Sequence, residues 1–275
     1  MKLRIATCAR LPEPDRDAEP FAAALVRAGI DAELVAWDDP AADWSGDVPT
    51  LIRSTWNYAL DVRGFLAWAA RVRPLWNPLA VIEENVFKRY LLALAARGVP
   101  VIPTVMLEAV PDALPALGDR IVVKPEVGAG SLGARVFAAG DAAALAHVRE
   151  LLARSAVLVQ PYVASVGDYG ERSLVWIDGE FTHAIRKSPR LAGDSEAVTG
   201  PFAIAPDEHA VAEAAIAPYA SQILYGRVDL ARDDAGQPRV MELELVEPSL
   251  FFSANPPSAD RFAAAIARAM LSPQP

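Results

Sequence analysis

The stretch that decides the fold runs from Ile121 to Val136 and reads I-V-V-K-P-E-V-G-A-G-S-L-G-A-R-V. An apolar, β-branched run carries Lys124 and then gives way to a glycine-rich loop. Glycine allows the backbone to turn with positive φ and to approach a ligand closely, and successive backbone N–H groups in such a loop suit phosphate. The stretch therefore predicts a nucleotide-phosphate site, for which the candidate residues are Lys124, Glu126, Gly128, Gly130, Ser131 and Gly133.

Three nucleotide-binding loops and one structural alternative compete for this pattern. A Rossmann loop should open a helix, whereas Ala134–Phe137 predicts a second strand. A protein-kinase loop places its lysine on a strand after the glycines, whereas Lys124 precedes them. A flap between two strands, closing over a nucleoside triphosphate, fits this order. An ordinary glycine hairpin fits the loop alone, so the remainder of the chain must distinguish the two.

Length, charge and cysteine content set wide limits on the function. The chain has 275 residues, a formal net charge of −9 and one cysteine, Cys8. The acidic balance argues against general nucleic-acid binding, and a single cysteine excludes an intrachain disulfide and favours a reducing compartment. The sequence contains no apolar run long enough to span a bilayer and no apolar signal-peptide region. We therefore expect a cytoplasmic protein that binds neither membranes nor nucleic acid.

The N-terminal part alternates strands and helices. Strands are predicted at 3–8, 30–37 and 50–53, and helices at 21–28 and 64–72, which indicates a small parallel α/β domain followed by a proline-containing linker at 73–78. Ligands of open α/β sheets bind beyond the carboxyl ends of the strands. The segment after the third strand therefore supplies the substrate candidates Arg53, Ser54, Trp56 and Asn57, although Arg53 is equally compatible with a surface role.

Further along the chain, two segments are candidates for nucleotide contacts. An amphipathic helix predicted at 84–97 carries Lys88, and a buried strand at 156–163 ends in Gln160, Pro161, Tyr162 and Val163. A strand that runs into a proline-containing segment exposes backbone groups that could contact an adenine edge, although a plain strand exit fits the same residues.

The last constellation is a predicted hairpin of two strands. Alternation places Arg227 and Asp229 on one face of the first strand, and Glu242 and Glu244 on one face of the second. Three carboxylates brought together would repel one another and raise each other's pKa, a conflict that Mg²⁺ removes because it binds carboxylate and phosphate oxygens. A solvated acidic strand face is the alternative.

Taken in order, these residues resemble the ATP-grasp superfamily, in the neighbourhood of glutathione-synthetase-like ligases. The resemblance implies an α/β (α+β) ATP-grasp fold: a pre-ATP-grasp domain at 1–80, a small flap subdomain at 81–163 and a C-terminal metal-binding subdomain at 164–275. It also implies that ATP and two Mg²⁺ ions are the cofactors. Asp229, Glu242 and Glu244 would be the metal ligands, Lys88 and Lys124 would contact the α/β-phosphates, and the glycine flap would cover the β/γ-phosphates.

The resemblance assigns the remaining site residues as well. The backbone of Gln160–Val163 would meet adenine, Glu171 the ribose hydroxyls, and Lys187 the γ-phosphate or an acyl-phosphate, with Arg227 as a second catalytic residue. Two motifs depart from the family pattern. The metal strand ends in Glu-Leu-Glu instead of Glu-x-Asn, and Glu171-Arg172-Ser173 stands where many relatives have Asp-x-Arg.

The implied reaction activates a substrate carboxylate as an acyl-phosphate, which an amine then attacks. The expected substrates are a small-molecule carboxylate, such as an amino acid or peptide, and an amine. Two alternatives remain: the same chemistry used within one molecule to close a ring, as in cycloserine-type relatives, and a nucleotide-binding module without turnover. The sequence leaves the oligomeric state open, with a homodimer as one alternative.

Overall fold

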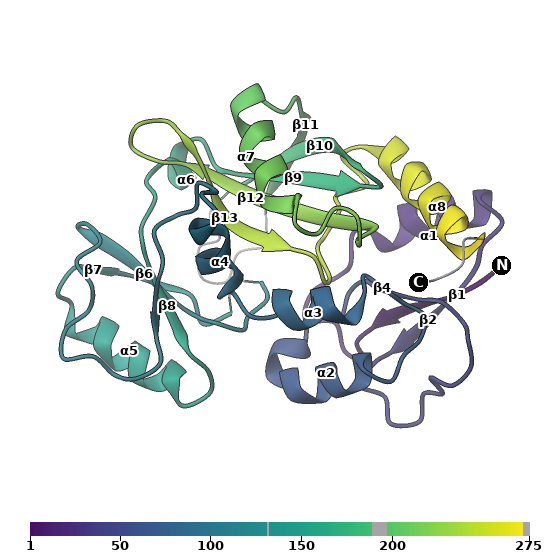
Figure 1. Cartoon of the computed structure of the whole chain (residues 1–275), viewed down its shortest axis with the longest axis horizontal. Helices are drawn as coiled ribbons and strands as arrows, with labels where there is room; N and C mark the ends of the chain where they lie inside the picture. Colours follow the sequence, from purple (N-terminus) through teal and green to yellow (C-terminus); the bar gives the residue numbers. More distant parts are fainter. Residues whose placement is uncertain (131, 189–196, 272–275) are drawn as a thin grey trace.

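Three β-sheets form the framework of the protein, and each carries helices of its own (Figure 1). The computed structural model describes residues 1–130, 132–188 and 197–271. No helix within these ranges is long and apolar enough to cross a membrane. The mixed α/β architecture agrees with the predicted fold class.

The N-terminal sheet is parallel, as the alternating pattern predicts. Its strands are, in sheet order, β2 (Asp31–Ala36), β1 (Lys2–Thr7), β3 (Thr50–Ile52) and β4 (Leu75–Trp76). Helices α1 (Ala18–Arg27) and α2 (Val62–Ala69) and the 3₁₀ turn η1 (Tyr58–Leu60) connect them. The predicted linker at 73–78 is wrong in part, because Leu75 and Trp76 are buried and pair with β3. Two prolines flank this short strand without removing its pairing.

The predicted helix at 84–97 is in fact two helices, α3 (Leu79–Asn85) and α4 (Tyr90–Ala96). Lys88 lies in the break between them and not on a helix. Its backbone N–H donates to the carbonyl oxygen of Glu126 at 3.0 Å, which is not a hydrogen bond within a helix. The break therefore ties Lys88 to the end of the strand that carries Lys124.

The second sheet is antiparallel and contains the glycine flap. Its order is β5 (Val105–Leu107), β8 (Val157–Pro161), β6 (Arg120–Pro125) and β7 (Arg135–Ala138), and α5 (Ala142–Leu152) packs on it. Strands β6 and β7 pair from Arg120↔Ala138 to Val123↔Arg135, so the glycine loop connects two antiparallel strands. This arrangement confirms the strand–loop–strand prediction and excludes a loop that opens a helix.

The central sheet carries the predicted carboxylate hairpin. Its order is β11 (Val198–Phe202), β10 (Glu180–Lys187), β9 (Glu171–Ile177), β12 (Tyr225–Arg232) and β13 (Pro238–Glu244). Asp229 pairs with Glu242 and Arg227 with Glu244, which confirms the predicted hairpin and supplies its register. The register shifts directly beyond the Asp229–Glu242 pair, where Leu230 pairs with Val240. Such a bulge bends a strand and redirects its side chains, and it is common beside active sites.

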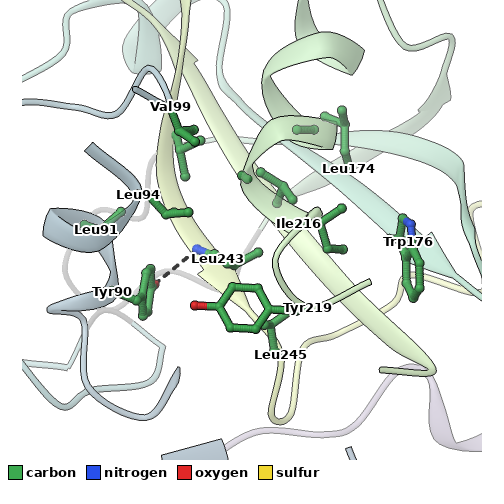
Figure 2. Close-up of a cluster of buried hydrophobic side chains, with 14 of the residues drawn as sticks. Tyr90, Leu91, Leu94, Val99, Leu174, Trp176, Ile216, Tyr219, Leu243 and Leu245 are labelled. Atoms are coloured by element: carbon green, nitrogen blue, oxygen red, sulfur yellow. Dashed lines mark hydrogen bonds between the residues drawn. The ribbon is translucent and has the colours of Figure 1, made fainter. Parts of the chain in front are cut away.

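A hydrophobic core beneath β13 holds the hairpin against two helices, α4 and α7 (Pro206–Ile216) (Figure 2). Leu91, Leu94, Ile216 and Leu243 are buried in it. The hydroxyl of Tyr90 accepts a hydrogen bond from the backbone N–H of Leu243 at 3.1 Å. Because Leu243 points into this core, alternation directs its neighbours Glu242 and Glu244 to the opposite face.

A long C-terminal helix, α8 (Pro256–Leu271), was not predicted from the sequence. It packs against α1, beside the N-terminal sheet (Figure 1). Phe21 of α1 stacks on Phe262 of α8 with ring centroids 5.2 Å apart. The short four-residue helix α6 (Ser165–Asp168) completes the described helices.

Candidate active site

One cavity of about 760 Å³ lies where the three sheets meet. The flap side contributes Lys124, Gly128 and Gly130, and the break between α3 and α4 contributes Lys88. The remaining predicted residues on its wall are Trp56 and Asn57 from the N-terminal part and Glu171, Lys187, Arg227, Glu242 and Glu244 from the central sheet. Residues from distant parts of the sequence thus face one space.

Glu242 joins the two predicted phosphate-binding lysines. Its Oε1 lies 3.0 Å from Lys124 Nζ and its Oε2 lies 3.4 Å from Lys88 Nζ. Burial acts to raise the pKa of Glu242, but the charges of Lys88 and Lys124 outweigh it and lower that pKa to about 2. Glu242 is therefore a carboxylate held between two cations.

Asp229 is the centre of a second ionic cluster. Its oxygens accept hydrogen bonds from Arg227 Nε at 2.8 Å and Arg227 Nη2 at 2.9 Å, and from Lys187 Nζ at 2.8 Å. Burial opposes ionisation, but Arg227 and Lys187 hold the pKa of Asp229 well below its usual range. Lys187 also forms an ion pair with Glu171, its cross-strand partner. Burial raises the pKa of Glu171 to about 7 against the opposing charge of Lys187.

Glu244 forms an ion pair with Arg227. Burial raises its pKa although Arg227 opposes the shift. Within the described residues, no three carboxylate, histidine or cysteine side chains are close enough together to hold a metal ion. The donor chemistry nevertheless fits Mg²⁺, because all three candidate ligands supply carboxylate oxygens and two of them face the cavity. Each of these carboxylates has a lysine or arginine as its present partner.

The glycines of the flap differ in their roles. Gly130 and Gly133 have positive φ, 59° and 77°, as expected, whereas Gly128 does not. A Cβ on Gly128 would lie 3.3 Å from the Pro125 side chain, so this position requires a small residue for space. Gly128 and Gly130 line the cavity and Gly133 does not. Ser131, a predicted phosphate contact, lies outside the described residues.

Glu126 and the segment Gln160–Val163 do not line the cavity. Glu126 is buried and forms an ion pair with Arg89. The amide of Gln160 donates to Thr104 Oγ1 at 2.8 Å, and the ring of Tyr162 is covered by the Arg120 guanidinium. Pro161 and Val163 are not among the residues that line the cavity either. The apolar part of the wall includes Val122 and Met241 instead.

The predicted substrate segment is divided between two environments. Trp56 and Asn57 line the cavity, whereas Arg53 and Ser54 are buried behind it. Arg53, which is 4% exposed, donates to the carbonyl oxygen of Pro248 at 2.9 Å and to Asp17 Oδ2 at 3.2 Å. The side chain of Asp17 also accepts hydrogen bonds from the backbone N–H groups of residues 250–252. Arg53 thus fixes the segment after β13 and does not line the cavity.

Several site residues escaped sequence reasoning. Tyr58, Asn85, Tyr90, Glu247 and Arg10 line the cavity. Asn85 and Asn77 hold the hairpin edge: Asn85 donates to the carbonyl oxygen of Leu243 at 2.9 Å, and Asn77 to that of Leu245 at 2.7 Å. A lone asparagine in a helical or linker pattern gives no signal of such a contact. Glu247 follows Glu242 and Glu244 closely in the sequence. This spacing could have indicated that Glu247 belongs to the same site.

Comparisons with known proteins agree with this arrangement. A family model described as the N-terminal domain of the D-cycloserine synthetase DcsG matches residues 3–77. The chain is 38% identical over 279 residues to the cycloserine biosynthesis protein DcsG of Streptomyces lavendulae, covering 92% of this chain and 93% of that protein. The crystal structure of D-cycloserine synthetase DcsG superposes with a TM-score of 0.89 at 36% identity, over 98% of this chain and 100% of that one.

More distant structures share the fold. The D-alanine–D-alanine ligase of Bacillus anthracis, complexed with ATP, has a TM-score of 0.69 at 17% identity and covers 98% of this chain and 97% of its own. A RimK domain ATP-grasp protein of Sphaerobacter thermophilus has a TM-score of 0.68 at 23% identity, over 98% and 100% of the two chains. The predicted superfamily is therefore confirmed: the chain belongs to the DcsG-like family of the ATP-grasp superfamily, enzymes that use ATP to join a carboxylate to an amine.

Proposed function

We propose that this enzyme closes a ring within one small amino-acid derivative, with Mg·ATP activating the carboxylate that a nitrogen of the same molecule then attacks. The observation that carries ring closure is the match of residues 3–77 to the N-terminal domain of a D-cycloserine synthetase. This part of the chain supplies Trp56, Asn57 and Tyr58 to the cavity, opposite the ionic clusters. D-cycloserine is a cyclic amide, and opening that amide gives β-aminooxyalanine, which carries carboxylate and nitrogen in one molecule.

The cations of the cavity suit phosphoryl transfer. We assign Lys88 and Lys124 to the α/β-phosphates and the loop at Gly128–Gly133 to the β/γ-phosphates. Lys187 and Arg227 would stabilise negative charge on the transferring phosphoryl group and on the acyl-phosphate. Val122 and Met241, which line the cavity, would provide the apolar wall for the adenine base, in place of the predicted Gln160–Val163 backbone. Glu171, on the same wall, remains our candidate for the ribose hydroxyls.

Asp229, Glu242 and Glu244 would hold two Mg²⁺ ions. Bound Mg²⁺ neutralises phosphate charge and orients the triphosphate. The residues of the chain must exchange partners for this to happen. Lys88 and Lys124 would leave Glu242 for phosphate oxygens, and Lys187 and Arg227 would leave Asp229 in part. The ion pairs between Glu242 and the two lysines would thus hold these side chains in position before the ligands bind. The phosphates of the nucleotide would then become the partners of the lysines, and Mg²⁺ the partner of Glu242.

The flap loop would also exclude water from the acyl-phosphate, which hydrolysis would otherwise destroy. The substrate nitrogen is held beside the activated carboxylate because both belong to one molecule, so ring closure gains from proximity. A ligation between two separate molecules uses the same residues and is the second candidate. The D-alanine–D-alanine ligase shares only the fold, so it does not favour this candidate.

A phosphate-release screen with Mg·ATP tests the proposal. The substrates are β-aminooxyalanine in both enantiomers and other serines that carry nitrogen on the hydroxyl oxygen, each alone and then paired with free amino acids. We expect phosphate release and a cyclic amide from a single such compound, with no requirement for a second. Release that occurs only with two different amino acids would replace ring closure by intermolecular ligation.

A further inference from the structure

Within the described residues, Glu247 forms no ion pair, unlike Glu171, Glu242 and Glu244 on the same cavity wall. Glu247 lines the cavity and is 9% exposed. Glu242 pairs with Lys88 and Lys124, Glu171 with Lys187, and Glu244 with Arg227. Across residues 1–130, 132–188 and 197–271, no other side chain forms an ion pair or a hydrogen bond with the Glu247 carboxylate.

A buried carboxylate without a counter-ion is costly. Burial, to which the charge of Glu244 adds, raises the pKa of Glu247 to about 8, although the charges of Lys88 and Arg227 oppose the shift. A hydrophobic residue at position 247 would avoid the free-energy cost of burying a carboxylate. A carboxylate at this position is therefore suited to pair with a cationic group of the bound ligand. Because Glu247 lies on the cavity wall, a cation bound in the cavity can contact this residue.

Aromatic residues surround this position. Trp56 donates its indole N–H to the backbone carbonyl oxygen of Glu247 at 3.1 Å, and both Trp56 and Tyr58 line the cavity. Burial, to which the charge of Glu247 adds, raises the pKa of Tyr58 well above its usual range. A carboxylate with aromatic rings beside it suits an organic ammonium group, whereas Mg²⁺ requires several oxygen ligands.

Arg227 is a cationic residue on the same cavity wall as Glu247. Arg227 contacts Glu244 and donates from Nη1 to the carbonyl oxygen of Ser249 at 3.1 Å, so it holds the chain on both sides of Glu247. A substrate carboxylate facing Arg227 would place a group on its α-carbon toward Glu247. We propose that Glu247, with Trp56 and Tyr58 beside it, binds the primary ammonium group of the substrate and selects amino acids over simple carboxylic acids. This assignment rests on the proposed function, since it names the group that one part of the cavity recognises.

Two variants and a control test the assignment in the full-length protein. Glu247→Gln removes the charge at nearly constant shape, and Glu247→Asp keeps the charge but shortens the side chain. The control Glu83→Gln removes a negative charge from an exposed position of α3 that does not line the cavity. The probes are two pairs that differ in the amino group: D-cycloserine with isoxazolidin-3-one, and serine (both enantiomers) with 3-hydroxypropanoate. Binding is measured by calorimetry in the presence of Mg²⁺ and a non-hydrolysable ATP analogue.

We expect the wild type to prefer the amino-bearing member of at least one pair by about tenfold or more. Glu247→Gln should lose most of that preference through weaker binding of the amino-bearing probe alone, Glu247→Asp should lose part of it, and Glu83→Gln should keep all of it. Full retention of the preference in Glu247→Gln, equal losses for both members of a pair, or no preference in the wild type would each overturn the proposal.

Thermal unfolding supplies an independent readout. Glu247→Gln breaks no ion pair, so its Tm should equal or exceed that of the wild type. A marked fall in Tm with unchanged preference would assign Glu247 to the fold and overturn the proposal. Failure of ring closure is a separate result: a Glu247-dependent preference for serine without any cyclic product would reject only the proposed function. A cyclic product with a preference that ignores Glu247 would reject only the ammonium site.

Discussion

Lys124 Nζ lies 3.0 Å from Glu242 Oε1, although the two residues are 118 positions apart in the sequence. This contact joins the strand before the flap to the hairpin that carries the candidate metal ligands. Lys88 contacts the other oxygen of the same carboxylate. The sequence suggested Lys88 and Lys124 as phosphate-binding residues and Glu242 as a metal ligand. In the structure these residues are direct neighbours.

The first prediction concerns Lys124. Lys124→Met should lower kcat/KM by about 100-fold, because one fixed cation for the phosphates is lost. The fold should persist because Lys88 still pairs with Glu242. Steady-state phosphate release and nucleotide binding check this, with Lys2→Met, an exposed lysine of β1, as control. Wild-type nucleotide affinity in Lys124→Met would remove this lysine from the phosphate site.

The second prediction concerns the hairpin carboxylates. Asp229→Asn and Glu242→Gln should each abolish Mg²⁺-dependent phosphate release while circular dichroism shows an intact fold. Each removes a charged oxygen ligand and leaves nearby cations without their partner. The matched control is Asp234→Asn at the exposed turn of the same hairpin, which should behave like the wild type. Unchanged turnover in both site variants would reject the metal assignment.

The third prediction separates structural from functional arginines. Arg53→Ala should lower the free energy of unfolding by about 3–5 kcal/mol, because Asp17 would remain buried without its cation. Arg27→Ala breaks the exposed Arg27–Asp260 pair and should cost at most about 1 kcal/mol. Urea unfolding measures both. Equal stability of the two variants, together with a raised substrate KM in Arg53→Ala alone, would restore the carboxylate-binding role expected from the sequence.

The fourth prediction is a pH dependence of stability from His183. Burial lowers the pKa of His183 from 6.5 to about 4. Between these values the unfolded chain binds more protons than the folded one, so stability falls as the pH drops from 6.5 toward 4, by up to about 3 kcal/mol. His183→Gln should reduce this loss when urea unfolding is compared at pH 7 and pH 5. The control His209→Gln changes a half-exposed histidine and should keep the wild-type slope. An unaltered slope in His183→Gln would show that other groups cause the acid sensitivity.

Much of this fold follows from sequence pattern. Strand alternation and turn chemistry predicted the β6–β7 flap and the β12–β13 hairpin with its charged residues on shared strand faces, because both depend on local periodicity and short connections. The helix break at Lys88 could not be predicted, since it depends on a hydrogen bond to Glu126, which is distant in the sequence. The division into domains at residues 80 and 163 stays a prediction.

The other features that the sequence did not predict also depend on residues that are distant in the sequence. Arg53 has the chemistry of a carboxylate ligand, but its partner Asp17 lies in a segment that carried no signal. Leu75 and Trp76 form a strand only because β3 offers an edge next to them. Glu247 stands out only once the cations of the cavity have been assigned to other carboxylates. Each of these features depends on long-range contacts that local patterns do not contain.

The central claim is that ATP activates the substrate carboxylate as an acyl-phosphate, and isotope transfer tests it most directly. The substrate is labelled with ¹⁸O in both carboxylate oxygens and turned over with unlabelled Mg·ATP, and the phosphate and the product are analysed by mass spectrometry. The account predicts one ¹⁸O in each released phosphate and the other in the cyclic amide. Unlabelled phosphate, released while the substrate is consumed, would contradict it.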